Sequence, residues 1–450
     1  MSKPTDIRLK QVTYSQERIQ YRTPIKFGGR VVNDALLFNV TADVETQDGR
    51  RGQGFGSMPM GNVWAWPTDK VDGETTLAAL VAFAERGVKA ADAHDSPGHP
   101  LELTHELAAA HGQIESDVEG QLSLADAMPR LAQLVAASPL EAAIHDAYGK
   151  AIGENSYNLL GAEFVNSDLS TYLTEEFAGE YLDQYTSRQP KAAMPIYHLV
   201  GALDPLFADD IAKRIDDGLP ETLGEWIQGD GLTHLKIKLN GDDLDWDVDR
   251  VVAVERAASE AQSVRACDRW FYSLDFNEKC ADVQYILDFL AKVGEKSAIA
   301  LDRVQYIEQP THRDLRANPE NRMHEAAKIK PVVIDESLLD LESLLLAREQ
   351  GYSGIALKAC KGHSEALLMG AAAQKYNLFL CVQDLTCVGA SFLHSASVAA
   401  RVPTVAAIEG NGRQYCPVGN MGWDERFPGM FNISDGTVAT SELSGAGLGF

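Results

Sequence analysis

Five short runs of sequence decide the fold of this chain: THLKIKL (residues 233–239), WFYSLD (270–275), VQYIE (304–308), VVI (332–334) and GIALK (354–358). Each run is rich in β-branched, aliphatic or aromatic residues, and helix-like stretches separate them. Three further runs lie at 196–200, 378–382 and 405–408. Strands that alternate with helices pair in parallel, so the pattern predicts a closed TIM-type barrel of seven to eight (β/α) units over residues 190–414, with a doubly wound open sheet as the alternative.

The residues before the barrel follow a different pattern. A hairpin is predicted over 31–56, with an Asp-Gly turn at 47–50, and apolar residues then recur at helical spacing from 76 to 152. This order predicts an α+β domain over residues 1–165, completed by the C-terminal tail at 415–450. The polar segment 166–193 joins the two domains, and its sequence indicates no role.

A glycine-rich sequence, Gly52-Gln53-Gly54-Phe55-Gly56, resembles a nucleotide-binding loop. That interpretation fails because no clear helix follows the glycines. The segment that begins there is unusually apolar, with Phe55, Met58, Met60, Trp64 and Trp66. It is either a lid over a partly hydrophobic substrate or ordinary core or subunit contact.

Three consecutive predicted strands end in a carboxylate: Asp275, Glu308 and Asp335. In a (β/α)₈ barrel the chemistry lies at the carboxyl ends of the strands, and neighbouring strands are about 4.8 Å apart. Three strand tips can therefore surround one ion, and hard oxygen ligands suit Mg²⁺ or Mn²⁺. The alternative is that each acid caps the helix after it.

Lysines flank these carboxylates in the sequence. Lys236 and Lys238 point to the same side of their strand, which we expect to be the barrel interior, and Lys358 lies across the barrel from them. We expect a metal and a neighbouring ammonium to lower the pKa of such a lysine toward that of a useful base. Two opposed bases would move a proton between the faces of one carbon, while the metal stabilises the enediolate.

The composition excludes some partners. The chain has 65 acidic and 40 basic residues and a formal net charge of −25, which argues against binding to nucleic acid or to anionic membranes. The N-terminal sequence MSKPTDIRLK lacks a signal peptide's apolar core, and no apolar run is long enough to span a membrane. Six cysteines without a C-x-x-C pair favour reduced thiols, and we expect a cytoplasmic protein.

The strand ends resemble the motifs of the enolase superfamily, in its branch of muconate-lactonizing and related enzymes. The matching sequences are Lys236-Ile237-Lys238 (K-x-K), Asp275-Phe276-Asn277 (D-x-N), Glu308-Gln309-Pro310 (E-Q-P), Asp335-Glu336-Ser337 (D-E-S) and the second lysine, Lys358. The sequence Asp146–Gly153, followed by Leu159-Leu160-Gly161, resembles the family's helix that leads into the barrel.

The resemblance implies that the N-terminal α+β domain caps the barrel mouth and that Asp275, Glu308 and Asp335 hold Mg²⁺. It also implies that Lys238 and Lys358 act as acid and base, with Lys236 supporting the developing negative charge. Asn277 and Glu336 would lie next to these groups. The resemblance further implies a small carboxylate substrate and a homo-oligomer, a dimer or a multiple of two.

The last two strands depart from the related patterns. The seventh ends in Gln383-Asp384 without a histidine, which disfavours the mandelate-racemase branch. The eighth ends in Glu409-Gly410-Asn411, where related dipeptide epimerases often have D-x-D, and this makes a dipeptide substrate doubtful. Asp384 and Glu409 are included as substrate-binding or neighbouring carboxylates. Glu409 would bind a substrate cation or donate a proton, or serve only as a structural acid.

Together these residues predict an enzyme that removes a proton α to a carboxylate. The leading hypothesis is a racemase or epimerase with two opposed lysines. The alternatives are a lyase or cycloisomerase, in which one lysine moves the proton and the other acts electrostatically, and a barrel retained as a binding protein.

Overall fold

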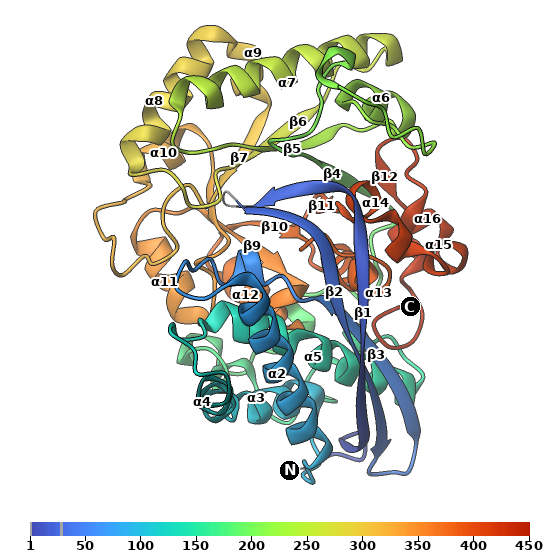
Figure 1. Cartoon of the computed structure of the whole chain (residues 1–450). Coiled ribbons are helices and arrows are strands. Elements are labelled where there is room, and N and C mark those ends of the chain that lie inside the picture. Colours follow the sequence, from blue (N-terminus) through green and yellow to red (C-terminus); the bar gives the residue numbers. More distant parts are fainter. Residues whose placement is uncertain (1, 28–29) are drawn as a thin grey trace.

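The computed structural model describes residues 2–27 and 30–450 and shows a barrel beside an N-terminal domain (Figure 1). Eight parallel strands form the barrel, which closes where its last strand pairs with its first through Ile408 and Ile196. In barrel order they are β4 (Met194–Val200), β5 (His234–Lys238), β6 (Phe271–Asp275), β7 (Val304–Glu308), β8 (Val332–Ile334), β9 (Gly354–Lys358), β10 (Phe379–Gln383) and β11 (Ile408–Glu409). The predicted closed barrel is confirmed.

Helices connect the barrel strands on the outside, as parallel pairing requires. Buried apolar side chains such as Ile286, Phe289 and Val293 form the inner face of one of them, α8. The connecting helices are α6 (Leu223–Asp230), α7 (Leu244–Arg265), α8 (Val283–Lys296), α9 (Ala298–Arg303), α10 (His324–Ile329), α11 (Leu341–Glu349), α12 (His363–Lys375) and α13 (Ala390–Arg401), with short 3-10 turns η5 (Ala208–Asp210) and η6 (Ala359–Lys361).

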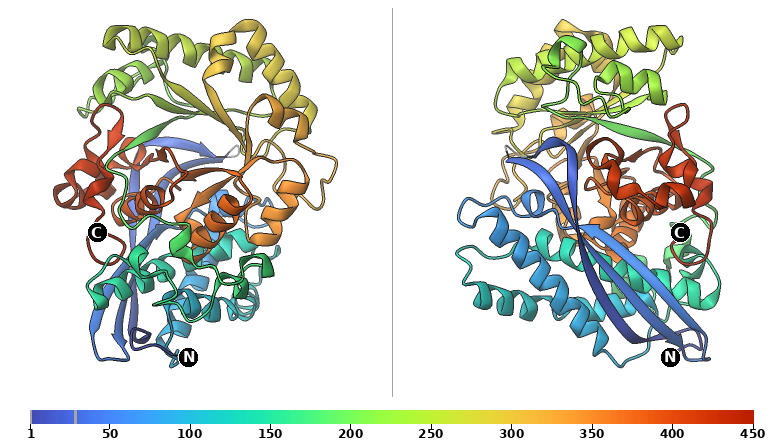
Figure 2. Two further views of the ribbon diagram at one scale, coloured as in Figure 1. Left: turned by 180° about the vertical axis from the view of Figure 1, so that it is seen from behind. Right: turned by 45° about the vertical axis from the view of Figure 1, so that its right-hand side comes forward.

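The N-terminal domain consists of a three-stranded antiparallel sheet and helices. Its strands are β1 (Ile7–Phe27), β2 (Arg30–Thr46) and β3 (Arg51–Pro59), and its helices are α1 (Asn62–Ala65), α2 (Gly73–Asp92), α3 (Pro100–Ala108), α4 (His111–Leu122) and α5 (Arg130–Ile152). The predicted hairpin, its turn at 47–50 and the following helices are confirmed, whereas β1 was not predicted. The β1–β2 hairpin reaches the barrel (Figure 2), where Arg22 forms an ion pair with Asp217 at 2.5 Å.

The glycines of β3 allow a helix to pack against the sheet at short distance. A β-carbon at Gly52, Gly54 or Gly56 would overlap the backbone of α5. At Gly54 the overlap would be with Ala143 and Ala147. The glycine-rich sequence is therefore a contact surface for α5.

The C-terminal tail joins the two domains. It contains α14 (Gly412–Tyr415), η7 (Pro417–Asn420), α15 (Trp423–Arg426), α16 (Pro428–Phe431), β12 (Thr437–Val438) and η8 (Thr440–Glu442). Strand β12 pairs antiparallel with β4 of the barrel. Beyond it, the backbone NH of Leu448 donates to the buried carboxylate of Asp146 on α5 at 2.9 Å. Asp146 also accepts from the NH of Phe55 at 2.9 Å, so one carboxylate connects the tail, α5 and the sheet.

The segment 166–193 runs along the junction between the domains. After η1 (Ser156–Leu159) it forms the 3-10 turns η2 (Leu169–Thr171), η3 (Glu175–Phe177) and η4 (Leu182–Gln184). Leu169, Phe177 and Leu182 are buried, and Gln374 of α12 donates to the carbonyl of Tyr185 at 3.0 Å. The segment thus packs against the barrel helices. The six cysteines are free, and no helix in the described part of the chain has the length and apolar character needed to cross a bilayer.

Candidate active site

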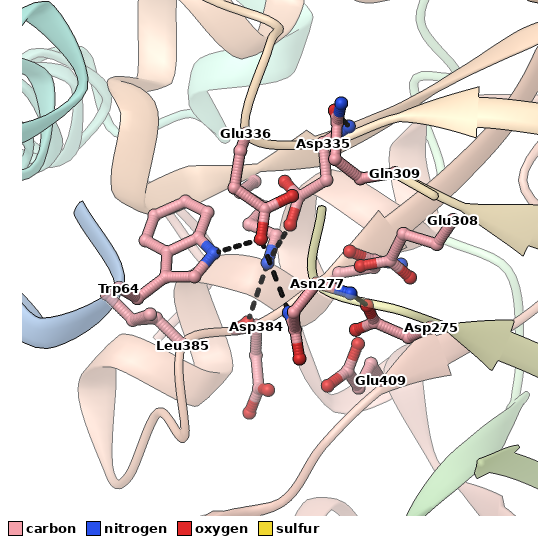
Figure 3. Close-up of polar contacts among 12 residues, drawn as sticks. Trp64, Asp275, Asn277, Glu308, Gln309, Asp335, Glu336, Asp384, Leu385 and Glu409 are labelled. Atoms are coloured by element: carbon pink, nitrogen blue, oxygen red, sulfur yellow. Dashed lines mark hydrogen bonds and ion pairs between the residues drawn. The ribbon is translucent and has the colours of Figure 1, made fainter. Parts of the chain in front are cut away.

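The three predicted carboxylates lie at the carboxyl ends of adjacent barrel strands (Figure 3). Asp275 is the last residue of β6 and pairs in register with Glu308, the last residue of β7. Asp335 directly follows β8. All three are buried, with side chains at most 1% exposed. Burial raises the pKa of Glu308 well above its ordinary value, and the neighbouring carboxylates Asp275 and Asp335 raise it further.

Lys236 lies among the carboxylates. Its Nζ is 2.9 Å from Glu308 Oε1, 2.8 Å from Glu409 Oε2 and 3.1 Å from Asp275 Oδ2. The side chain is 2% exposed, so water does not share in this charge compensation. The ammonium therefore connects the ends of β6, β7 and β11.

Lys238 and Lys358 end β5 and β9, and three acidic strands separate them around the barrel. Lys238 Nζ contacts Asp275 Oδ2 and donates to Asn277 Oδ1 at 2.9 Å. Lys358 Nζ lies 2.8 Å from Asp335 Oδ2. Both lysines are buried, at 6% and 5% exposure. They lie on opposite sides of the cluster formed by Asp275, Glu308 and Asp335.

In this structure the ion pairs of the lysines shift their pKa values in the direction opposite to the sequence prediction, which assumed a bound metal. Burial alone lowers the pKa of Lys358, but Asp335 outweighs it and the pKa is raised above its ordinary value. The pKa of Lys236 is raised for the same reason, because the charges of Glu308, Glu409 and Asp275 outweigh the effect of burial. The prediction of a lowered pKa counted the neighbouring ammonium groups and a metal. It did not count the direct ion pairs with the acids.

The arrangement and charge of these side chains bear on whether they can hold a divalent cation. Within residues 2–27 and 30–450, no three His, Cys, Asp or Glu side chains are arranged to hold a metal ion, because the lysines occupy the space between the acids. The net charge of the buried side chains is nevertheless compatible with a bound divalent cation. Ten titratable side chains gather here, all buried: Lys236, Lys238, Lys358, Lys361, Asp275, Glu308, Asp335, Glu336, Asp384 and Glu409. With all of these groups ionised, six carboxylates and four ammonium groups would carry two negative charges in excess. One divalent cation would balance them and would favour the ionised form of Glu308, whose pKa is raised in this structure. The donor set therefore fits Mg²⁺ or Mn²⁺ in charge and hardness.

Glu336 and Asn277 lie beside this group, as predicted. Asn277 Nδ2 donates to Glu336 Oε1 at 3.3 Å. The same oxygen accepts from the indole NH of Trp64 at 2.9 Å. Burial raises the pKa of Glu336 to about 7, and the adjacent Asp335 adds to the shift. Trp64 comes from the N-terminal domain, so the two domains share this site.

Asp384 and Glu409 form the other side of the site. Asn411 Nδ2 donates to Glu409 Oε1 at 2.6 Å and to Asp384 Oδ1 at 3.1 Å, and so links the two acids. Burial and the charge of Glu409 raise the pKa of Asp384 to about 7. Glu409 is bound directly to Lys236, whereas the carboxylate of Asp384 accepts from Asn411 and from backbone NH groups.

Three site residues were missed from the sequence. Lys361 approaches Asp335 Oδ1 to 3.1 Å from the turn after β9. Gln383, the last residue of β10, donates to Glu308. Gln309 accepts from the NH groups of Asp335 and Ser337 at 2.9 and 3.1 Å and fixes the loop after β8. Their positions at or just after strand ends were the available signal.

Comparison with known proteins agrees with this geometry. The family model described as "Enolase C-terminal domain-like" matches residues 219–450, more than half of the chain. The chain belongs to this family. A comparison of the sequence with curated proteins gives no match.

Solved structures show the same fold over nearly the whole chain. A mandelate racemase/muconate lactonizing protein from Herpetosiphon aurantiacus is similar with a TM-score of 0.64 and 20% identity, covering 99% of this chain and 98% of that one. A dipeptide epimerase from Enterococcus faecalis V583, complexed with Mg and L-Leu-L-Tyr, has a TM-score of 0.64 at 16% identity and covers 98% and 99%. A muconate lactonizing enzyme from Pseudomonas fluorescens has a TM-score of 0.59 at 17% identity and covers 98% and 96%.

These findings confirm the predicted enolase-superfamily membership and the TIM-type barrel. Family membership also supports the prediction that the chain is an enzyme. The assignment of roles to single residues stays a prediction.

Proposed function

We propose that this protein is a Mg²⁺- or Mn²⁺-dependent racemase or epimerase that removes and returns the proton α to a carboxylate. The observation that carries the proposal is the placement of Lys238 and Lys358 on opposite sides of a buried carboxylate group. One ammonium and one amine so placed would serve both faces of a carbon held between them.

The cation would be held by Asp275, Glu308 and Asp335, where it would neutralise the negative charge that develops on the substrate carboxylate. It would also compete with the lysines for the carboxylate oxygens and so free Lys238 and Lys358 for proton transfer. Lys238 would take the α-proton of one stereoisomer while a protonated Lys358 gives a proton to the opposite face, and the two lysines would exchange these roles for the other stereoisomer. Lys236, fixed by Glu308 and Glu409, would stay protonated and support the negative charge.

The remaining site residues would orient these groups. Asn277 fixes Lys238 from one side, and Glu336 contacts Asn277 and Trp64. Glu409 and Asp384 are proposed to line the substrate side of the site, where Glu409 would either bind a substrate cation or only hold Lys236.

Solvent exchange in D₂O tests the proposal. The protein is incubated with Mg²⁺ and a panel of N-acylated amino acids, dipeptides, proline derivatives and acid sugars. The expected result is deuterium at the α-carbon together with inversion. Lys238→Ala and Lys358→Ala are each expected to abolish inversion, and either variant keeping full activity would contradict the assignment.

The second candidate is a lyase or cycloisomerase. It is favoured by the similarity of the fold to muconate lactonizing enzyme and to the 2-chloromuconate cycloisomerase from Rhodococcus opacus 1CP. Loss of water or ring closure without inversion would select this candidate. A protein that binds members of the panel but leaves every α-hydrogen in place would be a binding protein.

We also propose a homo-oligomer, either a dimer or a multiple of two. Light scattering coupled to gel filtration tests this, and a mass of one chain, 49.0 kDa, would contradict it.

A further inference from the structure

A short helix of the N-terminal domain is wedged over the barrel mouth. Helix α1 places the buried Trp64 against the ends of β8 and β9. The residue before the helix, Gly61, packs so tightly that a β-carbon there would lie 2.6 Å from Leu385, which follows Asp384. Trp64 thus becomes part of the site, although it is 272 positions away in sequence from Glu336.

Barrel loops hold the backbone of this helix. The guanidinium of Arg313, in the loop after β7, donates to the carbonyls of Trp64 at 3.0 Å and Ala65 at 3.4 Å. The same guanidinium pairs at 2.6 Å with Glu278, in the loop after β6. Asn62 fixes the start of α1 to α2 by donating to the carbonyl of Gly73 at 2.8 Å. The position of the Trp64 ring is therefore determined from both domains.

The Trp64 side chain makes three contacts with charged side chains in the site. Lys358 Nζ lies 4.4 Å from the centre of the ring, within the range of a cation–π interaction, and Lys361 Nζ lies at 5.7 Å. The indole NH donates to Glu336 at 2.9 Å (Figure 3). Lys238 is held on the other side of the site, by Asp275 and Asn277.

Trp64 also lines a cavity of about 980 Å³ between the β1–β2 hairpin and α2. Met60 and Leu385 line the same cavity. Trp64 thus borders this space and also contacts the Lys358 ammonium. Without the Trp64 ring, water from the cavity would reach the Lys358 ammonium, and the Lys358 side chain would gain rotational freedom.

We propose that Trp64 is a positioning residue that holds the Lys358 ammonium in place and makes its orientation depend on docking of the N-terminal domain. The inference rests on the proposed function and deepens it, because it assigns a cap residue to one of the two proton-transferring lysines. Loss of the ring would then damage proton transfer on the Lys358 face and leave the Lys238 face working.

Crystal structures of three variants, without any substrate, test the positioning itself. In Trp64→Leu we expect Lys358 Nζ to move by about 1 Å or more while Lys238 stays in place, a displacement large enough to cost about a hundredfold in rate. Trp64→Phe keeps an aromatic face and should keep Lys358 near its position. Trp66→Leu is the matched control, since Trp66 is also buried and lies in the same segment. An unmoved Lys358 in Trp64→Leu would overturn the proposal.

Exchange of the α-hydrogen gives the functional readout, with the substrate found in the D₂O panel. In Trp64→Leu the isomer whose α-hydrogen faces Lys238 should still exchange without inverting, and the other isomer should exchange about a hundredfold more slowly. Trp64→Phe should recover most of that loss. Equal slowing of both isomers would indicate a merely structural role and would overturn the inference.

The Lys358→Ala variant separates the two possible failures. If Lys358→Ala stops exchange of one isomer while Trp64→Leu leaves both isomers unaffected, the role of Trp64 is wrong and the function stands. If Lys358→Ala leaves both isomers exchanging, the proposed function itself fails.

Discussion

Replacing His99 should make the protein less sensitive to acid. His99 is fully buried at the start of α3, where its Nδ1 accepts from the NH of Leu101 at 3.1 Å and its Nε2 lies 3.0 Å from the carbonyl of Leu159. Only a neutral imidazole with its proton on Nε2 satisfies both contacts. A second proton on Nδ1 would face the NH of Leu101, so the fold resists protonation.

The magnitude follows from the shift in pKa. Burial lowers the pKa of His99 from 6.5 to about 4. As the pH falls below 6.5 the unfolded chain takes up a proton that the folded chain refuses, so the contribution to stability is complete above 6.5 and is lost as the pH falls toward 4. Between pH 7 and pH 5 these two pKa values correspond to a loss of about 2 kcal/mol in the free energy of unfolding. For a chain of 450 residues this is about 2 °C in Tm.

The assay compares thermal unfolding at pH 7 and pH 5 in wild type and His99→Asn. Asparagine keeps an acceptor at the helix start but does not titrate. The variant should be less stable at pH 7, yet its Tm should fall by about 2 °C less than that of wild type on acidification. His105→Asn, at an exposed position in the same helix, should keep the wild-type pH dependence. An unchanged pH dependence in His99→Asn would refute the reasoning.

Two further predictions concern the site and the sheet. Glu308→Gln removes one of the proposed metal ligands, and calorimetric titration with Mg²⁺ or Mn²⁺ should show at least a tenfold loss of affinity; unchanged affinity would show that Glu308 is not a ligand. Gly54→Ala should lower the free energy of unfolding by about 1–3 kcal/mol, because the new β-carbon overlaps the backbone of α5. Gly87→Ala, in α2 with no atom near the added carbon, is the control and should be neutral or stabilising, and a Gly54→Ala variant as stable as this control would contradict the packing argument.

The barrel was predictable because its strands are short apolar runs at regular intervals, and strand ends bring chemistry to one edge whatever the details of packing. Strand β1 was missed for a physical reason. Among the strands of the described residues it pairs only with β2, and few of its side chains are buried, among them Ile7, Val12 and Ile19. A long edge strand of this kind shows no clear alternation of apolar and polar residues.

The site was predictable only in part. The strand-end acids and lysines could be found from spacing, but their ion pairs and the resulting rise in the pKa of Lys358 depend on which side chains meet. The segment around Trp64 had two interpretations from sequence, of which the lid over a substrate stays a prediction. Met58 and Trp66 are buried core, whereas Trp64 reaches the lysines. That difference depends on how the domains dock, which local sequence does not encode.

The proposed function depends most on one cation held between two opposed lysines. A crystal structure of the wild-type protein grown with Mn²⁺, with the ion located by anomalous scattering, tests this directly. We expect a single strong peak about 2.0–2.2 Å from oxygens of Asp275, Glu308 and Asp335, with the Nζ atoms of Lys238 and Lys358 on opposite sides of the space beside it. A peak elsewhere, or no peak with the carboxylates still paired to lysines, would contradict it.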